Sequence, residues 1–406
     1  MGSFLIRGGK ALSGTVIVNG SKNSALPVLF ATILTRGRSV IRNLPAIKDV
    51  AVSTEILLEL GAKLSYEGND LTVDTTSLSY KQPSDSLVCS LRASTYLIGA
   101  MLSRFGKARI SSFGGCNFSK RPIDLHIKAA EAFGARLCGD VLSTKGLRGA
   151  IHNIEKASVG ATVNSLLLAA SAEGSSTLTG YATEPHIKDL ISFLSSAGAQ
   201  ITECDGCLYV KGGELHGGEV TLRGDMIEAG TYLSAALVTG GTVRVCGANA
   251  DELSSYLSRV APACKIVGDN EIVADGLAAL DCFAVTTAPY PGFPTDLQPL
   301  VSTVMAKHSG GKITEQVWQG RFGYLDSLKP FGINSRVSVN TAEIFPSKFS
   351  SANTAATDLR GGAACILAAL GANGKSRIDS GELVLRGYES PILKLRSLGA
   401  EIEYLK

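Results

Sequence analysis

Six nearly uniformly apolar stretches of ten to twelve residues recur along the chain at regular intervals. A helix that is apolar all round must be buried on every side, so each stretch predicts a helix in the centre of the fold. The six predicted central helices span 24–34, 93–102, 162–172, 227–238, 297–306 and 359–370.

The polar and apolar positions that follow each central helix repeat in the same order. A β-branched strand comes first, as at 38–41 and 241–245. A loop and an amphipathic second helix come next, as at 185–197, and a pair of strands, such as 63–66 with 70–73, ends the unit. Apolar helices inside and strands outside predict a mixed α/β fold, inverted relative to a TIM barrel.

A glycine that ends the second helix, followed by a small residue, marks the period of the repeat. The period is about 68 residues. One of the six expected glycines is missing, and residues 260–263 occupy its position in the repeat. Six units fill the chain, three per domain, with a division near 218–223. The pattern leaves open which domain the first strand, 4–7, joins. The repeated glycines are Gly61, Gly134, Gly198, Gly332 and Gly399.

Composition narrows the class of protein. In 406 residues, 45% are hydrophobic and 18% charged, which is typical of a globular protein with two or three cores. A net charge of +3 gives no field that favours nucleic acid, and no apolar run reaches a membrane span. Nine cysteines behind an N-terminus without a signal-peptide pattern indicate a reducing cytosol. We therefore expect a cytoplasmic protein with no nucleic-acid or membrane partner. The oligomeric state is left open.

Charged and polar residues head the central helices. Helices in repeated units are expected to be parallel, and their gathered N-termini would form an anion site at one end of each domain. A second ring of residues lies in the loops that precede the outer helices. The first set is Lys22, Asn23, Arg92, 158–160, Asp225, Thr295, Asp296, Asp358 and Arg360, and the second is Cys116, Arg121, Glu184, Arg321 and Arg386.

Cys116 is a candidate reactive thiol. Two glycines precede it, and Lys120 and Arg121 follow, and such cations favour the thiolate. The alternative is a small residue in a glycine-rich turn. His126, in the same stretch, is expected to orient the loop through a hydrogen bond.

Three motifs are excluded as sites. The stretch 371–376 resembles the end of a phosphate-binding loop, but it lacks the first glycine and follows a helix. Cys204 and Cys207 form a lone C-x-x-C pair, which we interpret as a turn between two strands. The five histidines show no i, i+4 pair. The sequence therefore predicts no metal and no cofactor.

The motifs, taken in order, resemble the UDP-N-acetylglucosamine 1-carboxyvinyltransferase family of enolpyruvyl transferases over nearly the whole chain. The resemblance implies an inside-out α/β barrel with two pseudo-threefold domains. It places one domain at 21–221 and the other at 1–20 plus 222–406, so the N-terminal strand crosses into the C-terminal domain. The motifs are Lys22-Asn23, Arg92, the run 114–126, 158–162, 292–298 and 386–389.

The resemblance also implies a reaction: transfer of the enolpyruvyl group of phosphoenolpyruvate to the 3′-hydroxyl of UDP-N-acetylglucosamine, in peptidoglycan synthesis. Cys116 would donate a proton and Asp296 would hold and deprotonate the hydroxyl, with Lys22 and Arg386 completing the catalytic set. The implied phosphoenolpyruvate ligands are Lys22, Asn23, Cys116, Arg121 and Arg386. The implied UDP-N-acetylglucosamine contacts are Asn23, Arg92, Arg121, Pro122, Ile123, Asp124, Leu125, Lys156, Ala157, Ser158, Val159, Gly160, Thr295, Asp296 and Val317, with Arg321 and Arg360 as supporting cations.

Met226 replaces the family's usual arginine, and Gln319-Gly320 replaces Glu-Asn, so interdomain salt bridges and closing geometry could differ. Three alternatives stay open. They are 5-enolpyruvylshikimate-3-phosphate synthase, an enolpyruvyl transferase with another nucleotide acceptor, and an inactive paralogue that binds UDP-sugars.

Overall fold

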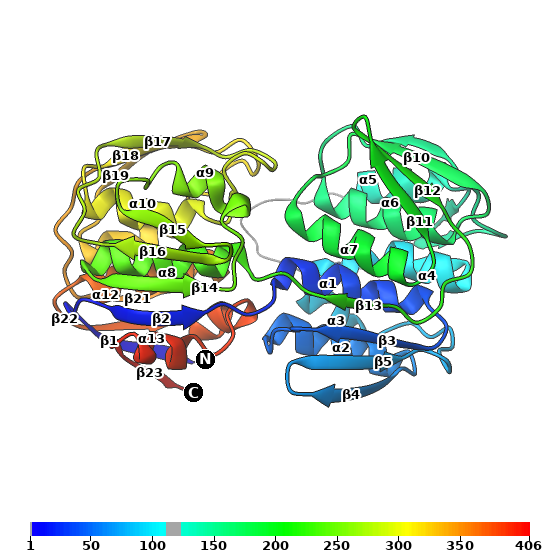
Figure 1. Ribbon diagram of the computed structural model, residues 1–406, viewed down its shortest axis with the longest axis horizontal. Coiled ribbons are helices and arrows are strands. Elements are labelled where there is room, and N and C mark those ends of the chain that lie inside the picture. Colours follow the sequence, from blue (N-terminus) through cyan, green and yellow to red (C-terminus); the bar gives the residue numbers. More distant parts are fainter. Residues whose placement is uncertain (1, 111–122) are drawn as a thin grey trace. The chain divides into compact units, whose positions relative to one another are not determined.

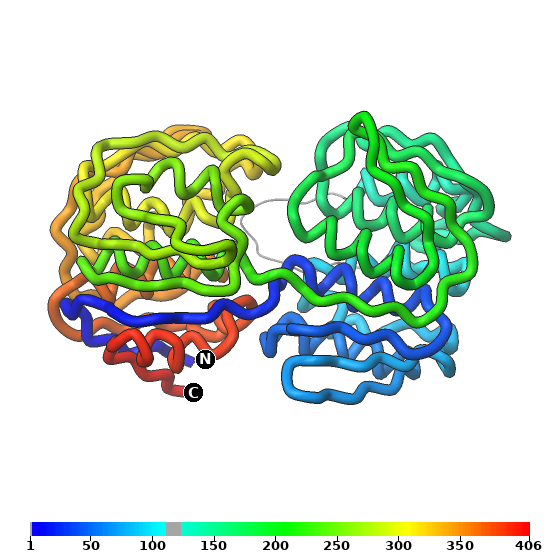
Figure 2. Tube along the Cα trace, in the orientation of Figure 1, coloured from blue at the N-terminus to red at the C-terminus, as the bar shows by residue number. Residues whose placement is uncertain are grey.

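The chain forms two compact units in a computed structural model that describes residues 2–110 and 123–406. The continuous unit is Gly20–Arg223, and the discontinuous unit is Met1–Asn19 together with Gly224–Lys406. The N-terminal segment thus lies in the same unit as the C-terminal half of the chain (Figure 2).

The continuous unit contains three central helical segments with outer helices and three sheets. The sheets have the strand orders β13-β3-β5-β4, β6-β8-β7 and β11-β12-β10-β9. Its helices are α1 Lys22–Ala31, η1 Thr32–Leu34, α2 Lys48–Glu59, α3 Asp85–Ser90, η2 Arg92–Tyr96, α4 Leu97–Phe105, α5 Asp124–Ala132, α6 Val159–Ser171 and α7 Pro185–Ser196. Its strands are β3 Arg38–Arg42, β4 Lys63–Glu67, β5 Asp70–Asp74, β6 Lys107–Arg109, β7 Arg136–Cys138, β8 Val141–Ser143, β9 Ile151–Asn153, β10 Ser175–Thr179, β11 Gln200–Cys204, β12 Cys207–Lys211 and β13 Glu219–Thr221.

The discontinuous unit repeats this plan with the sheets β15-β16-β14-β2, β17-β18-β20-β19 and β21-β22-β1-β23. Its helices are α8 Met226–Thr239, η3 Asp251–Leu253, α9 Ser254–Leu257, α10 Gln298–Lys307, α11 Tyr324–Leu328, η4 Lys329–Phe331, α12 Leu359–Gly371, η5 Gly381–Arg386 and α13 Pro391–Ser397. Its strands are β1 Ser3–Gly8, β2 Ser13–Ile17, β14 Thr242–Cys246, β15 Cys264–Gly268, β16 Glu271–Asp275, β17 Phe283–Thr286, β18 Gly311–Thr314, β19 Ser335–Ser338, β20 Thr341–Ile344, β21 Asn353–Ala355, β22 Gly374–Asp379 and β23 Glu401–Leu405.

The six predicted central helices are confirmed. In the discontinuous unit, α8, α10 and α12 contact one another and lie among the sheets (Figure 1). Their residues are buried on nearly every face, because the sequence offers no polar stripe that could face water. In the continuous unit the same positions are taken by α1 with η1, η2 with α4, and α6. The inside-out α/β fold class is correct.

The repeated glycine has a conformational cause. All five adopt a positive φ at the end of the outer helix, where a residue with a Cβ would be strained. The repeat is therefore visible in the sequence because the same helix stop recurs. The φ angles are 97° at Gly61, 91° at Gly134, 116° at Gly198, 82° at Gly332 and 97° at Gly399.

The first strand completes the last sheet. Strand β1 lies between β22 and β23 and is antiparallel to both, so Ile6 pairs with Ser376 on one side and Ile402 on the other. In the other five sheets this position belongs to a hairpin formed within one repeat. The question that the pattern left open is answered, and the first strand joins the discontinuous unit.

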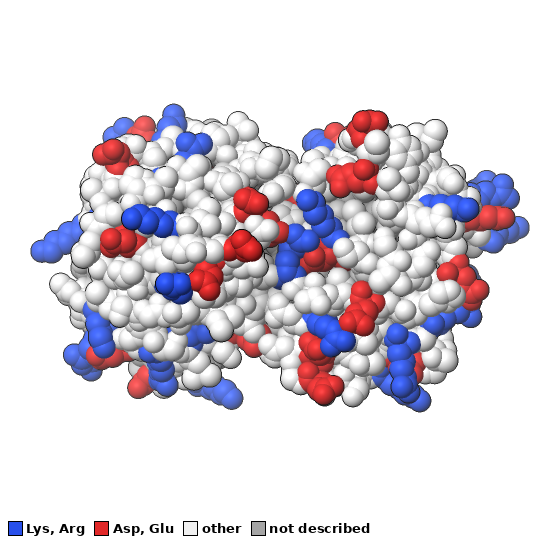
Figure 3. All heavy atoms as spheres, in the orientation of Figure 1, with Lys and Arg blue, Asp and Glu red and all other residues white. Residues whose placement is uncertain are grey.

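The surface of each unit carries both signs of charge. Figure 3 shows basic and acidic side chains interspersed on the visible face of each unit. Surface pairs such as Arg42 with Glu219 and Arg244 with Glu271 join neighbouring strands. Among the described residues, no helix is long and apolar enough to cross a membrane.

Candidate active-site residues

Asp296 lies in the turn directly before α10 and pairs with two arginines. Its Oδ1 is 2.9 Å from Nη1 of Arg321, and its Oδ2 is 3.2 Å from Nε of Arg360. The side chain of Asp296 is 31% exposed, whereas those of Arg321 and Arg360 are 6% and 2% exposed. One partly accessible carboxylate is therefore held by two cations buried beneath it.

The two arginines set the charge state of this carboxylate. Burial alone would raise the pKa of Asp296, but the positive charges of Arg321 and Arg360 outweigh it and hold the pKa well below its usual range. Asp296 is therefore ionised at neutral pH and accepts hydrogen bonds strongly. It is a weak base for as long as both arginines pair with it.

Arg360 extends from α12 into an aromatic and acidic surrounding. Its guanidinium lies 5.2 Å from the ring centre of Tyr388, whose hydroxyl is 2.8 Å from Oγ1 of Thr231. Burial would lower the pKa of Arg360, but Tyr388 and Asp296 raise it. Its Nη1 is buried and has no hydrogen-bond partner among the described residues.

Lys22 begins α1 in the continuous unit and is fixed by a carboxylate that the sequence analysis did not single out. Its Nζ lies 2.7 Å from Oδ2 of Asp49 on α2, and both side chains are largely buried. Asp49 therefore holds the ammonium group of Lys22 in one place at the start of the helix.

His126 lies on α5 and is buried against α6. Its Nδ1 is 2.8 Å from Nδ2 of Asn164, and Oδ1 of Asn164 accepts a hydrogen bond from the backbone N–H of Gly99 at 2.6 Å. Burial, together with the positive charge of Arg92, lowers the pKa of His126 to about 4. Burial also lowers the pKa of Arg92. The hydrogen bond of His126 thus joins α5 to α6 through Asn164, while the loop that His126 was expected to orient lies outside the described residues.

Two expected anion-binding helix ends are closed by their own side chains, which corrects the expectation at these positions. Oδ1 of Asp225 accepts from the N–H groups of Ile227 and Glu228 at 2.8 and 3.1 Å. Oδ1 of Asp358 does the same for Arg360 and Gly361 at 2.9 and 3.0 Å. Because each cap uses these donors and is itself a carboxylate, which repels an anion, the two residues stabilise helix starts instead of leaving them open to an anionic ligand.

Among the other predicted site residues, Ser158 caps α6 with its side chain. Gly160 lies against His126, and a Cβ atom at position 160 would come within 2.6 Å of Cε1 of the imidazole. Arg386 ends η5. Cys116, Arg121 and Pro122 lie outside the described residues. The structure thus brings together Thr295, Asp296, Arg321 and Arg360 in one unit. In the other unit Ile123, Asp124 and Leu125 lie at the start of α5, Asn23 lies in α1, and Lys156, Ala157 and Val159 lie around the start of α6.

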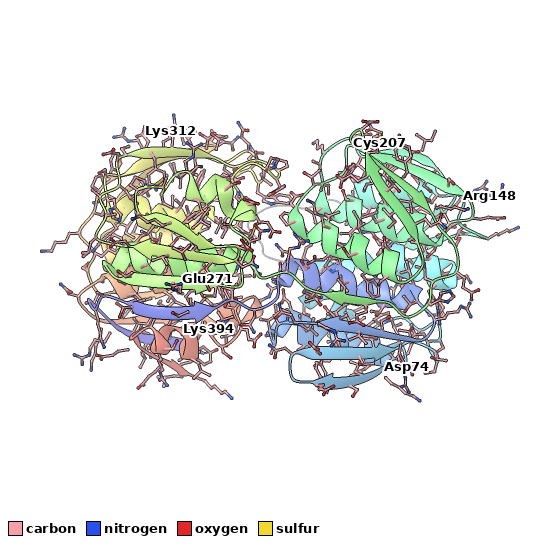
Figure 4. All side chains as sticks on the ribbon, in the orientation of Figure 1. Asp74, Arg148, Cys207, Glu271, Lys312 and Lys394 are labelled. Atoms are coloured by element: carbon pink, nitrogen blue, oxygen red, sulfur yellow. The ribbon has the colours of Figure 1, made fainter. Side chains whose placement is uncertain are left out.

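Of the residues that depart from the expected pattern, Gly320 has a structural explanation, and nothing in the structure explains Met226 or Gln319. Gly320 has a φ of 75°, a conformation that glycine and asparagine adopt more readily than other residues, so glycine for asparagine preserves this turn. Near Met226, the buried carboxylate of Glu228 accepts from Nζ of Lys394 at 2.6 Å and from the backbone N–H of Asn19 at 3.0 Å (Lys394 is labelled in Figure 4).

Cys204 and Cys207 flank a two-residue turn between β11 and β12, as predicted. The two turn residues, Asp205 and Gly206, both have positive φ, which is the signature of a tight hairpin (Cys207 is labelled in Figure 4). Among the described residues, no group of three histidine, cysteine or acidic side chains could hold a metal ion.

Comparison with known proteins gives consistent results over the whole chain. Residues 6–395 match the EPSP synthase (3-phosphoshikimate 1-carboxyvinyltransferase) family. The chain is 42% identical to UDP-N-acetylglucosamine 1-carboxyvinyltransferase 3 of Caldanaerobacter subterraneus, over 99% of both chains, and 38% identical to UDP-N-acetylglucosamine 1-carboxyvinyltransferase of Halothermothrix orenii, over 100% of both.

Solved structures agree on the fold. The enolpyruvyl transferase NikO from Streptomyces tendae superposes with a TM-score of 0.90 at 27% identity, covering 100% of this chain and 99% of that one. EPSP synthase from Acinetobacter baumannii superposes with a TM-score of 0.75 at 18% identity, covering 100% of both chains, a likeness that concerns the fold. Sequence and fold together show that the chain belongs to the EPSP synthase family of enolpyruvyl transferases.

Proposed function

We infer that the chain is a UDP-N-acetylglucosamine 1-carboxyvinyltransferase. It transfers the enolpyruvyl group of phosphoenolpyruvate to the 3′-hydroxyl of UDP-N-acetylglucosamine and releases phosphate, in the first committed step of peptidoglycan synthesis. The observation that carries this conclusion is full-length identity of about 40% to relatives of that name. The side chains found around Asp296 and Lys22 have the charges that this chemistry needs.

The donor is the part of the reaction that demands cations. Phosphoenolpyruvate carries a phosphate and a carboxylate on three carbons, so its binding from water requires several converging positive groups. We assign this role to Lys22, Asn23, Arg121 and Arg386, with Cys116 beside the reacting carbons. The buried, fixed ammonium of Lys22 supports the assignment, because it is already oriented by Asp49.

Asp296 acts on the acceptor. Its ionised carboxylate accepts a hydrogen bond from the 3′-hydroxyl and orients the oxygen toward C2 of the donor. While both arginines pair with it, proton abstraction is weak. A change that weakens the pairing with Arg321 or Arg360 would raise the pKa of Asp296 and make the carboxylate a better base.

The chemistry proceeds by addition and elimination. Cys116 gives a proton to C3 of phosphoenolpyruvate, and the sugar oxygen attacks C2 as Asp296 takes the hydroxyl proton. The resulting tetrahedral intermediate loses the phosphate from C2 and a proton from C3, which restores the enol double bond on the new ether. Neither step calls for a metal or an organic cofactor.

The acceptor contacts are assigned to both units. The nucleotide would be held by residues of the continuous unit. They are Arg92, Arg121, Pro122, Ile123, Asp124, Leu125 and the start of α6 with its cap Ser158. Thr295, Asp296 and Val317 would hold the sugar. The proposed domains are 21–221 and 1–20 plus 222–406, and the proposed location is the cytosol.

A coupled phosphate-release assay tests the function. With phosphoenolpyruvate present, we expect phosphate release only when UDP-N-acetylglucosamine is added, and mass spectrometry should find the enolpyruvyl ether. D296N should reduce the rate by at least a hundredfold, whereas D326N, an exposed aspartate of the same unit, should not. Equal release with shikimate 3-phosphate or UMP would assign a different acceptor.

A further inference from the structure

Glu315 is the most thoroughly hydrogen-bonded buried carboxylate of the described residues near Asp296. It follows β18 directly and is 1% exposed. Its Oε1 accepts from Oγ1 of Thr287 at 2.8 Å and from the backbone N–H groups of Val317 and Trp318 at 2.7 and 2.8 Å. Its Oε2 accepts from Oγ1 of Thr295 at 2.8 Å and Nε2 of Gln298 at 3.3 Å. A carboxylate in such a position orders everything that donates to it.

The hydrogen bonds of Thr295 run in one direction only. Its Oγ1 accepts from Nη1 of Arg321 at 2.9 Å, and an arginine can only donate, so the hydroxyl proton of Thr295 must point to Glu315. The same Nη1 lies 2.9 Å from Oδ1 of Asp296. Glu315 therefore acts through Thr295 and Arg321 on the carboxylate proposed to bind the acceptor hydroxyl.

The other carboxylate oxygen of Glu315, Oε1, fixes the backbone of the loop that follows β18. Val317 is the proposed sugar contact of this loop, and its N–H and that of Trp318 both point at Oε1 of Glu315. Gln298, the first residue of α10, donates from Nε2 to Glu315 and to the carbonyl of Arg321, so the same group ties the helix start to the loop. One side chain thus orders the turn before α10 and the loop after β18.

We propose that Glu315 is a positioning residue for the acceptor, which sets the place of Asp296 through Thr295 and Arg321. The proposal rests on the proposed function, because it concerns how that reaction is oriented. Glu315 touches no reacting atom. Its contribution is that the carboxylate of Asp296 has one orientation when the substrate arrives, and a misplacement of about 1 Å in such a group can lower a rate on the order of a hundredfold.

The variant E315Q separates the two sides of this carboxylate. The amide NH₂ cannot face Val317 and Trp318, since both are donors, so it must take the place of Oε2. At that place the new amide NH₂ donates to Oγ1 of Thr295, which already accepts from Arg321. The side-chain amide of Gln298 can rotate so that its oxygen, which is unpartnered among the described residues, accepts from the same NH₂ group. The contacts with Val317 and Trp318 survive, whereas Thr295 can no longer donate its hydroxyl proton to residue 315, which is the bond by which Glu315 acts on Arg321.

Steady-state kinetics test the proposal. We expect E315Q to lower kcat by about 10- to 100-fold and to change the KM for UDP-N-acetylglucosamine by less than about threefold, because most proposed nucleotide contacts lie in the other unit. T295V, which removes the hydroxyl, should lose a similar factor. T295S, which keeps it, should recover at least about tenfold relative to T295V. The double variant E315Q/T295V should be no slower than the slower single variant, since both break one path.

Controls separate this role from a purely structural one. E343Q, on the neighbouring strand β20 with a partly exposed carboxylate, should keep wild-type kinetics. A folded E315Q with wild-type kcat would overturn the proposal, as would losses of E315Q and T295V that multiply in the double variant. If E315Q does not fold, equal rates for T295V and T295S overturn the proposal, because the hydroxyl that joins Glu315 to Arg321 would then have no effect on the rate. A wild-type enzyme with no acceptor-dependent phosphate release would instead refute the proposed function.

Discussion

The buried imidazole of His126 predicts a specific loss of stability at mildly acidic pH. The histidine is 5% exposed and its Nδ1 faces the NH₂ group of Asn164. That amide cannot turn over, because its oxygen accepts from Gly99 and its nitrogen also donates to the carbonyls of Thr95 and Gly160. A protonated His126 would bring two donors face to face, so the folded unit keeps the ring neutral.

The size of the effect follows from the pKa. In the folded unit, burial and the charge of Arg92 lower the pKa of His126 to about 4, against an ordinary value of about 6.5. A histidine with a lowered pKa contributes stability that is present above pH 6.5 and is lost as the pH falls toward 4. At 1.36 kcal/mol per pKa unit, the full loss is about 3 kcal/mol, and about 2 kcal/mol of it falls between pH 7 and pH 5.

The assay is urea unfolding at pH 7, 6 and 5, followed by circular dichroism, because the single tryptophan, Trp318, lies in the other unit. We compare the wild type with H126Q, and only the pH-dependent part of their difference in unfolding free energy counts. The wild type should lose about 2 kcal/mol more than H126Q between pH 7 and pH 5. H216Q, at an exposed histidine of the same unit, measures the background of the substitution.

Parallel curves for the wild type and H126Q over this range would refute the reasoning, since they would mean that His126 titrates alike in the folded and unfolded chain. R92Q gives a second check. Without the guanidinium charge, the pH dependence that His126 causes should shrink but persist, because burial is the larger cause.

Three further predictions concern the proposed site. K22M should abolish turnover and cost about 3 kcal/mol of unfolding free energy, because it removes the ammonium group 2.7 Å from the buried carboxylate of Asp49. K22M/D49N, which removes the carboxylate charge as well, should regain stability without activity, as measured by urea unfolding and phosphate release. Fosfomycin should add its mass to the peptide that contains Cys116 and to no other, and an inhibited enzyme with this peptide unmodified would contradict a reactive thiol at Cys116. Titration with UDP-N-acetylglucosamine should quench Trp318 fluorescence, because Trp318 neighbours the proposed contact Val317, and an unchanged signal at saturation would count against that contact.

The stability expected of Asp296 variants changes once the structure is known. As a catalytic residue inferred from sequence alone, Asp296 would be expected to be replaceable by alanine with a large loss of turnover and little loss of stability. In the structure, Asp296 neutralises Arg321 and Arg360, both nearly inaccessible, so D296A should lower the melting temperature as well as the rate. A thermal shift assay on D296A and D296N measures this directly.

The repeat and the central helices could be predicted from sequence because they depend on local rules. Apolar stretches without a polar stripe have to be buried, and the glycine at each helix stop is required by its positive φ. The first strand could not be assigned in this way. Its pairing with β22 and β23 joins residues nearly 400 positions apart, and only the family resemblance indicated it.

The residues that support the site were harder to find from sequence. Asp49 looks like an ordinary acidic residue in the first turn of a helix, and Glu315 like the polar end of a strand. Asn164 did carry a signal, because an amide in the middle of an apolar helix must find partners. For Asp225 and Asp358 the sequence predicted a role in a ligand site, because both stand at helix starts. That prediction was wrong, since both side chains cap their helices.

The placement of β1 between β22 and β23 makes the two units unequal during synthesis. The continuous unit has all its strands and helices once residue 223 has left the ribosome, so it can fold while the rest is still being made. In the other unit, β1 is synthesised first but has no partner until β22 and β23 are made, so the sheet that contains these three strands is completed last. A ribosome stalled near residue 390 should therefore carry one protease-resistant half and one that is still open.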